Sequence, residues 1–238
     1  MNELKIHKNI TINKLKVPGT DKKVYIIDNF LHDLDSILNF AYNIAYFNPM
    51  FSDNSFYPGI RDHMPQPYLR ILKTFFLEHI LPDLGSQYNE VKLHRSLLSL
   101  VTCKPEQLII QQKMPHIDTF DQQHYAFVHY LSQQDFGGTS LYKYKPDNII
   151  EFHEEHSPIL EKMVNDIKNT PEEHSGYINN STSIFERVLK VDAKPNRLVI
   201  YQGNLLHSAN ILLDDNGYNK DPKCGRLAIS SFATLIKG

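Results

Sequence analysis

The chain has 238 residues, of which 41% are hydrophobic, so it is long enough to bury one substantial core as a single domain. Its 25 Lys and Arg residues nearly balance its 27 Asp and Glu residues without charged blocks, so the composition indicates neither a nucleic-acid partner nor a membrane surface. Because its first residues lack the apolar core of a secretory signal, and no apolar run reaches the roughly 18 residues that a membrane span needs, we expect a cytoplasmic protein.

Residues 1–95 predict a strand and two supporting helices. The run KVYIIDNFL at residues 23–31 is typical of a short strand, and residues 34–47 follow with apolar side chains at helical spacing. A second helix is expected over residues 68–84. Its apolar stripe, at intervals of three and four residues, consists of Leu69, Leu72, Phe76, Ile80 and Leu84.

From residue 96 onward, short runs rich in β-branched and aromatic residues predict a β-barrel or sandwich. The runs are LLSLVTC, QLIIQQK, HYAFVHYLS, TSLYKY, RVLKVDA, RLVIY, LHSANILL and RLAISSFATLI. Residues 147–185 interrupt them, and we expect this insertion to form a lid or substrate wall over one mouth of the barrel. The chain is therefore predicted to be one domain, residues 1–238, mainly β with flanking helices (α+β).

His116 and Asp118 are the first candidates for metal ligands. On an extended backbone, side chains two positions apart project to the same face, so an imidazole and a carboxylate can bind one ion. The pair alone is a weak signal, because a turn with a salt-bridging or helix-capping Asp explains it as well. His207 follows a strand and a turn that would return the chain beside the pair, and it completes a set of two histidines and one carboxylate with open coordination positions.

Other histidines and the two cysteines are weaker candidates. His124 and His129 lie near the pair in sequence, and strand alternation allows at most one of them to point inward. We expect both to have structural roles or to support the ligands. Cys103 and Cys224 are too few for a disulfide framework and are not at metal-ligand spacing, so we expect free thiols.

Taken together, the motifs resemble a known enzyme superfamily. The order His-x-Asp, a strand ending in Tyr-Leu, Gly-Gly-x-x-x-Tyr, a distant His and Arg-x-Ala-Ile-Ser resembles the prolyl-4-hydroxylase-like branch of the 2-oxoglutarate/iron(II)-dependent oxygenases. In finer detail, YPGIR, PHID, FVHYLS, GGTSLY, GYINNSTSIFERV, NRLVIYQGNLLHS and GRLAIS resemble the bacterial DUF6445 family, which is uncharacterised. The resemblance implies a double-stranded β-helix core (jelly-roll or cupin-like) over residues 96–238.

The resemblance also implies a ligand set and cofactors. His116, Asp118 and His207 would bind iron(II), with 2-oxoglutarate and O2 as co-substrates. Arg226 would bind the distal carboxylate of 2-oxoglutarate, because a guanidinium is a natural receptor for a carboxylate inside a barrel. The segment between His207 and Arg226 is longer than is usual in the superfamily, and the excess is the polar loop of residues 214–223, which leaves both ends in place.

Several neighbours could complete the pocket. Ser230 is expected on the same strand face as Arg226, where its hydroxyl could assist in binding the oxoacid. Tyr130 occupies the position of a tyrosine that donates to the same carboxylate in similar enzymes, and an ordinary core tyrosine explains it equally well. Tyr142 is expected to line the pocket, and Arg61, in a YPGIR loop, is either a surface arginine or a substrate contact.

The expected function is an iron(II)/2-oxoglutarate-dependent dioxygenase that hydroxylates an unactivated C–H bond. Its substrate would be an amino acid, a peptide or protein side chain, or a small natural product, and neither the substrate nor the oligomeric state is identified by the sequence. One alternative is a non-catalytic or degenerate cupin-like barrel that binds a metal or ligand. Another is a zinc-dependent hydrolase or isomerase that uses the same triad. Because Asp118 is retained, a halogenase is disfavoured.

Overall fold

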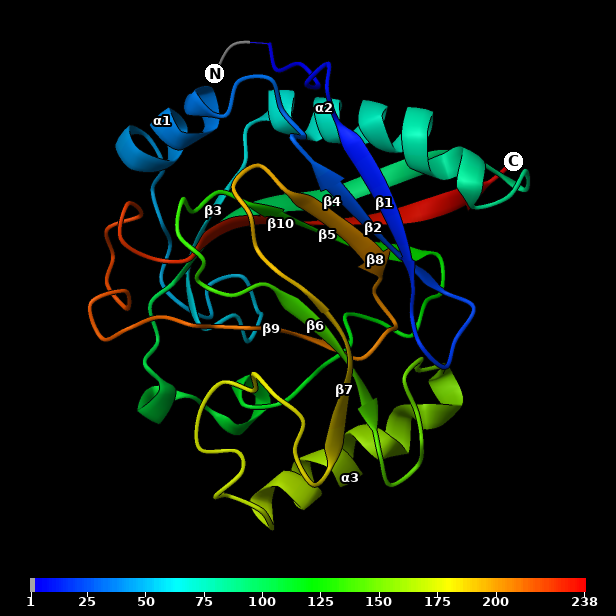
Figure 1. Ribbon diagram of the computed structural model, residues 1–238, viewed down its shortest axis with the longest axis vertical. Coiled ribbons are helices and arrows are strands. Elements are labelled where there is room, and N and C mark those ends of the chain that lie inside the picture. The colour runs from blue at the N-terminus through cyan, green and yellow to red at the C-terminus, as the bar shows by residue number, and fades with distance from the viewer. Residues whose placement is uncertain (1–2) are drawn as a thin grey trace.

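The computed structural model describes residues 3–238, in which two antiparallel β-sheets face each other and helices cover their outer faces (Figure 1). The first sheet has seven strands in the spatial order β1 (Thr11–Lys16), β2 (Lys23–Asp28), β8 (Leu198–Gln202), β5 (His124–Tyr130), β10 (Leu227–Lys237), β4 (Tyr88–Val101) and β3 (Gly59–His63). The second has three strands in the order β7 (Phe185–Val191), β6 (Thr139–Tyr144) and β9 (His207–Ala209). The expectation of a mainly β chain with flanking helices is confirmed.

Strand β5 shows how the core is divided by the larger sheet. Ala126 and Tyr130 face the three-stranded sheet and pack with Leu141 in the core between the sheets. Tyr125 and Phe127 point the other way, into a larger apolar cluster beneath the helices. Because both faces of β5 are covered, its sequence is almost continuously apolar rather than alternating.

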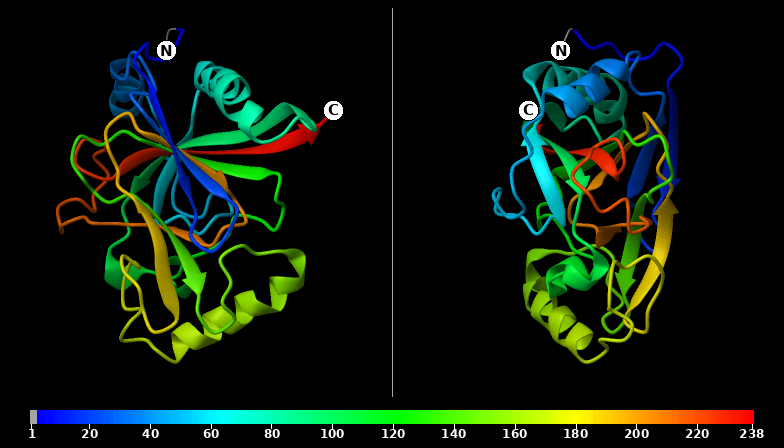
Figure 2. Two further views of the ribbon diagram at one scale, coloured as in Figure 1. Left: turned by 45° about the vertical axis from the view of Figure 1, so that its right-hand side comes forward. Right: turned by 90° about the vertical axis from the view of Figure 1, so that its left-hand side faces the viewer.

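Two helices cover the outer face of the seven-stranded sheet (Figure 2). They are α1 (Asp35–Asn43) and α2 (Gln66–Phe75), and α2 continues as a π-helical turn (Phe76–Ile80) and a 3-10 turn (Leu81–Asp83). The helix expected over residues 68–84 is therefore present, but its last turns are irregular. Pro82 contributes to this ending, because proline has no amide hydrogen and cannot continue an α-helical hydrogen-bond ladder.

The insertion at residues 147–185 lies mainly behind the three-stranded sheet. Its helix α3 (Ser157–Lys168) packs through Met163 and Ile167 against Tyr144 and Phe185, on the sheet face that points away from the seven-stranded sheet (Figure 1). This helix therefore supports the smaller sheet. Other residues of the insertion, His153, Glu154 and Glu155, line a cavity with the segment that follows Asp118, so a lid or substrate wall stays a prediction for the insertion. Tyr142, which was expected to line the pocket, belongs to the same cluster as Met163 and is fully buried there, so it does not face the core between the sheets.

Successive strands pass back and forth between the two sheets. After β4 in the larger sheet, His116 pairs with His207 of the smaller one, and the chain then returns to the larger sheet as β5. Strands β6 and β7 pair antiparallel in the smaller sheet although the 147–185 insertion separates them in sequence, and β8, β9 and β10 then alternate between the sheets. The N-terminal strands β1 and β2 extend one edge of the larger sheet, β3 extends the other, and β4 crosses the expected boundary at residue 95.

The run QLIIQQK was expected to be a strand, and this expectation is wrong. The chain there makes two 3-10 turns, at Pro105–Gln107 and Ile110–Gln112. The side-chain carbonyls of Gln107 and Gln112 accept the amide hydrogens of Lys104 and Ile109, at 3.1 and 3.0 Å, and so stabilise turns rather than an extended backbone.

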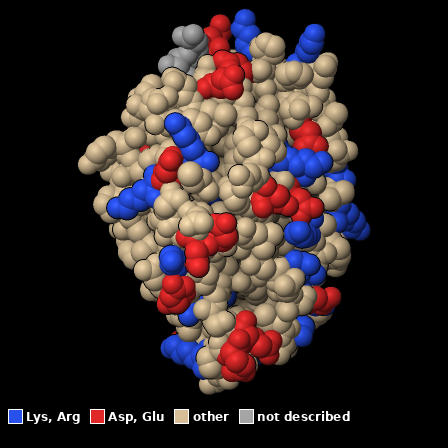
Figure 3. Space-filling model, turned by 60° about the vertical axis from the view of Figure 1, so that its left-hand side comes forward, with Lys and Arg blue, Asp and Glu red and all other residues tan. Residues whose placement is uncertain are grey.

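Basic and acidic side chains are interspersed over the face drawn in Figure 3, in keeping with the near balance of charges in the sequence. Among residues 3–238, no helix has the length and apolar character needed to cross a membrane.

Candidate metal centre

Two backbone pairings bring the three candidate ligands together. His116 and His207 donate their amide hydrogens to each other's carbonyl oxygens, both at 2.8 Å, and their ring centroids lie 4.4 Å apart. Asp118 donates its amide hydrogen to the carbonyl of Gly203, also at 2.8 Å, in the turn that follows β8. As a result, one possible ligand atom from each of His116, Asp118 and His207 lies within 4.8 Å of the others.

The two imidazoles are suited to metal ligation. Nδ1 of His207 lies 2.8 Å from the carbonyl oxygen of Leu205, which can only accept, so Nδ1 carries the hydrogen and Nε2 keeps its lone pair. That Nε2 atom lies 3.7 Å from Oδ2 of Asp118. Burial lowers the pKa of His207 to about 4, and burial together with the neighbouring His207 lowers the pKa of His116 to about 4. Both rings are therefore neutral at neutral pH.

Asp118 is a carboxylate without hydrogen-bond donors. Its side chain is 16% exposed, burial raises its pKa, and no group among residues 3–238 donates a hydrogen bond to its carboxylate. An anion in such surroundings is costly unless a cation lies beside it. His207 is buried, whereas His116 and Asp118 are open to solvent. The protein around these two residues nevertheless shifts both of their pKa values. A metal held here would keep positions that small molecules can reach.

Arg226 lies just before β10 and is 4% exposed. Its Nη2 atom donates to the carbonyl of Gly138 at 3.1 Å, while its Nε atom is buried without a hydrogen-bond partner among the residues that the structure describes. The guanidinium lies 5.6 Å from the ring centre of Tyr130, whose hydroxyl is 2.6 Å from Oγ1 of Thr139. The structure therefore brings Arg226 and Tyr130 together on the inner side of the larger sheet.

Ser230 is not part of this group. It occupies the same face of β10 as Ala228, but at about 3.4 Å per residue it lies roughly 14 Å along the strand from Arg226. Its backbone partner in β5 is Val128, not Tyr130. The structure thus places Ser230 away from the guanidinium that it was expected to assist.

The two neighbouring histidines point to opposite sides of the larger sheet, as alternation predicted. His124 faces inward, stacks on Phe232 and lies close enough to Asp118 for that carboxylate to act on its pKa, which burial lowers. His129 faces the helices, with its ring nitrogens 3.2 Å from the Tyr68 hydroxyl and 3.1 Å from Oδ1 of Asn196. His129 is therefore a structural residue, and His124 is a neighbour of the candidate ligands.

Arg61 was expected in a loop, most simply at the surface, but it lies on β3 with its side chain 13% exposed. Nη1 pairs with Asp53 at 2.8 Å, and the guanidinium stacks over the ring of Tyr57 at 4.0 Å. The Tyr57 hydroxyl is buried without a partner among the described residues, and the nearby charges of Arg226 and Arg61 partly oppose the rise in its pKa that burial causes. Sequence reasoning missed Tyr57, because no spacing links it to the ligands.

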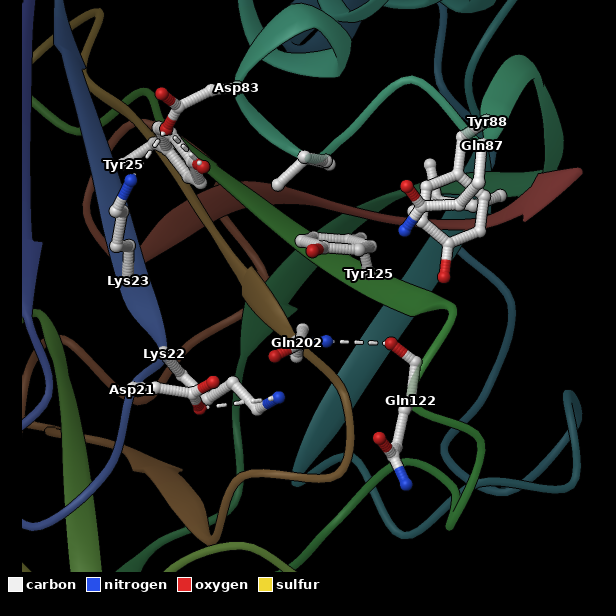
Figure 4. Close-up of a pocket in the computed structure, with 12 residues that line it drawn as sticks. Asp21, Lys22, Lys23, Tyr25, Asp83, Gln87, Tyr88, Gln122, Tyr125 and Gln202 are labelled. Carbon is white, nitrogen blue, oxygen red and sulfur yellow. Dashed lines mark hydrogen bonds and ion pairs between the residues drawn. The ribbon is translucent and has the colours of Figure 1, made fainter. Parts of the chain in front are cut away.

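Two cavities lie outside this cluster. One of about 380 Å³ opens on the helix side of the larger sheet (Figure 4). Tyr25 and Tyr125 of the sheet line it together with Gln87 and Tyr88. The other, of about 610 Å³, is lined by Thr119, Phe120, Asp121, Gln122, His153, Glu154 and Glu155. Neither is lined by a predicted site residue, so the donor atoms, rather than the shape of a pocket, identify the candidate centre.

Comparison with known proteins gave one family match over almost the whole chain. Residues 8–233 match the family described as "Family of unknown function (DUF6445)", which confirms the resemblance read from the motifs. No curated protein matches the chain.

Solved structures gave more distant matches. An oxidoreductase of the 2OG-Fe(II) oxygenase family from Burkholderia pseudomallei is 9% identical, with a TM-score of 0.46 over 87% of this chain and 80% of that one. HygX from Streptomyces hygroscopicus, solved with nickel and 2-oxoglutarate bound, is 11% identical, with a TM-score of 0.43 over 84% of this chain and 77% of that one. At such scores the likeness transfers no residue role to this chain.

Proposed function

Because the chain belongs to the DUF6445 family, whose function is unknown, we propose its activity from the site itself: it is an iron(II)- and 2-oxoglutarate-dependent dioxygenase. The observation that carries the proposal is the convergence of ligand atoms from His116, Asp118 and His207 within 4.8 Å. Two imidazoles and one carboxylate that leave coordination positions open are the donor set of non-haem iron(II) oxygenases.

The strand order supports a double-stranded β-helix as the scaffold. In the larger sheet, β4, β10, β5 and β8 are neighbours, and in the smaller sheet His116 pairs beside β9, which is followed by β6 and β7. These seven strands and the His116 bridge, which takes the place of an eighth strand, alternate between two facing sheets as in a jelly roll. In this proposal the whole chain is one domain, with residues 1–95 supporting a core of residues 96–238.

The donor atoms fit iron(II) for reasons of charge and protonation. Both imidazoles are neutral, and the Asp118 carboxylate has no hydrogen-bond donor among the described residues, so a divalent cation would stabilise its charged form. The Leu205 carbonyl accepts a hydrogen bond from Nδ1 of His207 and so holds the ring with Nε2 towards Asp118, as backbone carbonyls commonly do for metal-binding histidines.

The oxoacid is assigned to Arg226. Its buried Nε atom has no hydrogen-bond partner within residues 3–238, and a guanidinium with free N–H groups binds a carboxylate with strong, directed hydrogen bonds. Tyr130 and Tyr57 flank this guanidinium and hold their hydroxyls in the same buried region. Iron(II) and 2-oxoglutarate, when bound, supply the oxidation, in which O2 and the oxoacid are converted with a substrate C–H bond to succinate, CO2 and a C–OH group.

The protein's own residues position the reactants and limit the access of water. We propose an amino acid, a peptide or protein side chain, or a small natural product as the substrate, and hydroxylation as the outcome. A cytoplasmic location is part of the proposal, because Cys103 and Cys224 are both free thiols.

The test is succinate formation from 2-oxoglutarate by the purified protein with iron(II), ascorbate and air. We expect slow turnover without substrate in the wild type and none in His207→Ala. Metal binding without any affinity for 2-oxoglutarate would instead support a non-catalytic barrel. Activity on a hydrolysable substrate that persists with zinc in an anaerobic chamber would support a hydrolase, and either result would overturn the oxygenase proposal.

A further inference from the structure

We propose that Arg61 is a second carboxylate receptor in this site and that it binds a carboxylate of the substrate, while Arg226 binds 2-oxoglutarate. The inference rests on the proposed function and narrows the substrate class to molecules that carry a carboxylate group close to the carbon that reacts.

The first support is the register of the larger sheet. Arg61 on β3 pairs with Ser99 on β4, Ser99 pairs with Ala228 on β10, and Ala228 pairs with Tyr130 on β5. Residues directly opposite each other in a sheet project from the same face, so the Arg61 side chain starts from the inner face that Tyr130 and Ala228 occupy. The side chain of Arg226, two residues before Ala228, starts from that face too. Because β4 lies between β10 and β3, its starting point is displaced sideways from that of Arg61 by about two strand spacings, or roughly 10 Å.

The second support is the way in which the guanidinium is held. Nη1 of Arg61 donates to Oδ2 of Asp53 at 2.8 Å and to Oγ of Ser55 at 3.0 Å, and the group stacks on Tyr57. Nε is buried without a partner, and no hydrogen bond from Nη2 is formed to any residue in the range 3–238. The Nε and Nη2 edge of a guanidinium is a fork that matches the two oxygens of a carboxylate. Asp53 and Ser55 therefore hold the group through Nη1, while its Nε and Nη2 edge has no hydrogen-bond partner among the described residues.

Arg197 shows what a structural arginine looks like in the same chain. It is 9% exposed, and all three of its nitrogens donate: Nε and Nη2 to Asp28, at 2.6 and 2.9 Å, and Nη1 to the carbonyl of Asp192, at 2.8 Å. Arg61 is buried to a similar degree but leaves its fork unpaired. Because buried donors are nearly always paired, an open fork at this depth indicates a missing acceptor.

The third support is the position of Arg61 relative to Arg226. The Arg61 guanidinium stacks on the ring of Tyr57 at 4.0 Å, and the buried Tyr57 hydroxyl lies close enough to Arg226 to be influenced by its charge. A carboxylate on the Nε and Nη2 edge of Arg61 would therefore lie near the oxoacid at Arg226 but on a separate receptor.

The experiment follows the arginine Nε–H groups by NMR in protein loaded with Zn(II) and 2-oxoglutarate. The Arg61 and Arg226 resonances are assigned by their absence from Arg61→Lys and Arg226→Lys. Acetate is the probe, and acetamide, which has the same shape but no charge, is its control. We expect acetate to shift the Arg61 resonance saturably, acetamide to leave it unchanged, and neither to reverse the shift that 2-oxoglutarate causes at Arg226.

A second measurement uses variants. In Arg61→Gln we expect acetate to bind about tenfold to a hundredfold more weakly, with less than a twofold change for 2-oxoglutarate. Arg70→Gln, at an exposed position on α2, should change neither affinity. No response of Arg61 to acetate, an equal response to acetamide, or a response of Arg61 to 2-oxoglutarate itself would each overturn the inference. Failure of the proposed function would appear separately, as an Arg226 resonance that 2-oxoglutarate does not move.

Discussion

His116 and His207 form a reciprocal backbone pair, each donating its amide hydrogen to the other's carbonyl at 2.8 Å. This arrangement fixes the relative position of two imidazoles whose residues are far apart in the chain, and their ring centroids lie 4.4 Å apart. The candidate metal centre is thus assembled by backbone pairing between segments that are far apart in the chain. Substitution of either side chain should therefore remove a ligand without removing the pairing that holds the backbone.

This expectation gives the first prediction. His116→Ala and His207→Ala should each bind Ni(II) or Co(II) at least about 100-fold more weakly than the wild type, because one of three donor atoms is lost. Isothermal titration calorimetry of the purified variants measures the change. His32→Ala, which removes an exposed imidazole near the N-terminus, is the matched control and should bind metal normally. Equal affinity in all four proteins would show that the triad is not a metal site.

Arg226 gives the second prediction. In Arg226→Gln the affinity for 2-oxoglutarate should fall about tenfold to a hundredfold, because charge-assisted hydrogen bonds to the distal carboxylate are lost. Pyruvate lacks that carboxylate, so its affinity should be the same in the variant and the wild type. Titration of the Ni(II)-loaded proteins with both oxoacids checks this, and a parallel loss of pyruvate binding would place Arg226 elsewhere in the site.

The strands that the sequence predicted best are those with two covered faces. The runs containing β5 and β10 carry apolar side chains on both faces, because one face meets the helices and the other meets the second sheet. Strand β1 was missed because TINKLK is an edge strand with exposed lysines, which protect such an edge from further pairing. Strand β3 was missed because GIRDH follows Pro58 and carries charged side chains, so its local pattern is that of a loop.

The candidate site was predictable only as a set of residue types. His116, Asp118, His207 and Arg226 could be chosen from motifs, because their chemistry and order match a known pattern. The environment of Arg61 could not, because its ion pair with Asp53 and its register opposite Ser99 arise from tertiary pairing. The position of Ser230 was expected from strand alternation, which fixes the face of a side chain but not its distance from a partner.

His129 provides a third prediction, on stability and pH. Burial lowers its pKa from 6.5 to about 4, opposed by the hydrogen bond to Asn196. Between pH 4 and pH 6.5, His129 binds a proton more strongly in the unfolded chain than in the folded protein. The stability that the neutral ring contributes is therefore complete above pH 6.5 and is lost as the pH falls towards 4. In metal-free protein this single group accounts for about 3 kcal/mol over that window.

The measurement is urea unfolding from pH 7 to pH 4 for the wild type and His129→Gln. The variant should be less stable at pH 7, because a buried aromatic ring and its contacts with Tyr68 are lost, but its stability should decline less steeply with acid. His116, His124 and His207 remain in both proteins, so the difference in slope isolates His129. Parallel curves would mean that His129 does not titrate between these pH values.

Gly203 gives the last prediction, which links the turn after β8 to the metal centre. A methyl group at this position would overlap Nδ1 of His124 and lie 3.3 Å from Cβ of Asp118, while the Gly203 carbonyl accepts the Asp118 amide hydrogen at 2.8 Å. Gly203→Ala should therefore displace the carboxylate and weaken metal binding about tenfold, at the modest cost in stability that overpacking brings. Adding His124→Ala removes the overlapped ring and should restore most of the affinity. If the double variant binds metal as weakly as Gly203→Ala, the effect does not pass through His124, and the methyl group acts on Asp118 directly or through the backbone of the turn.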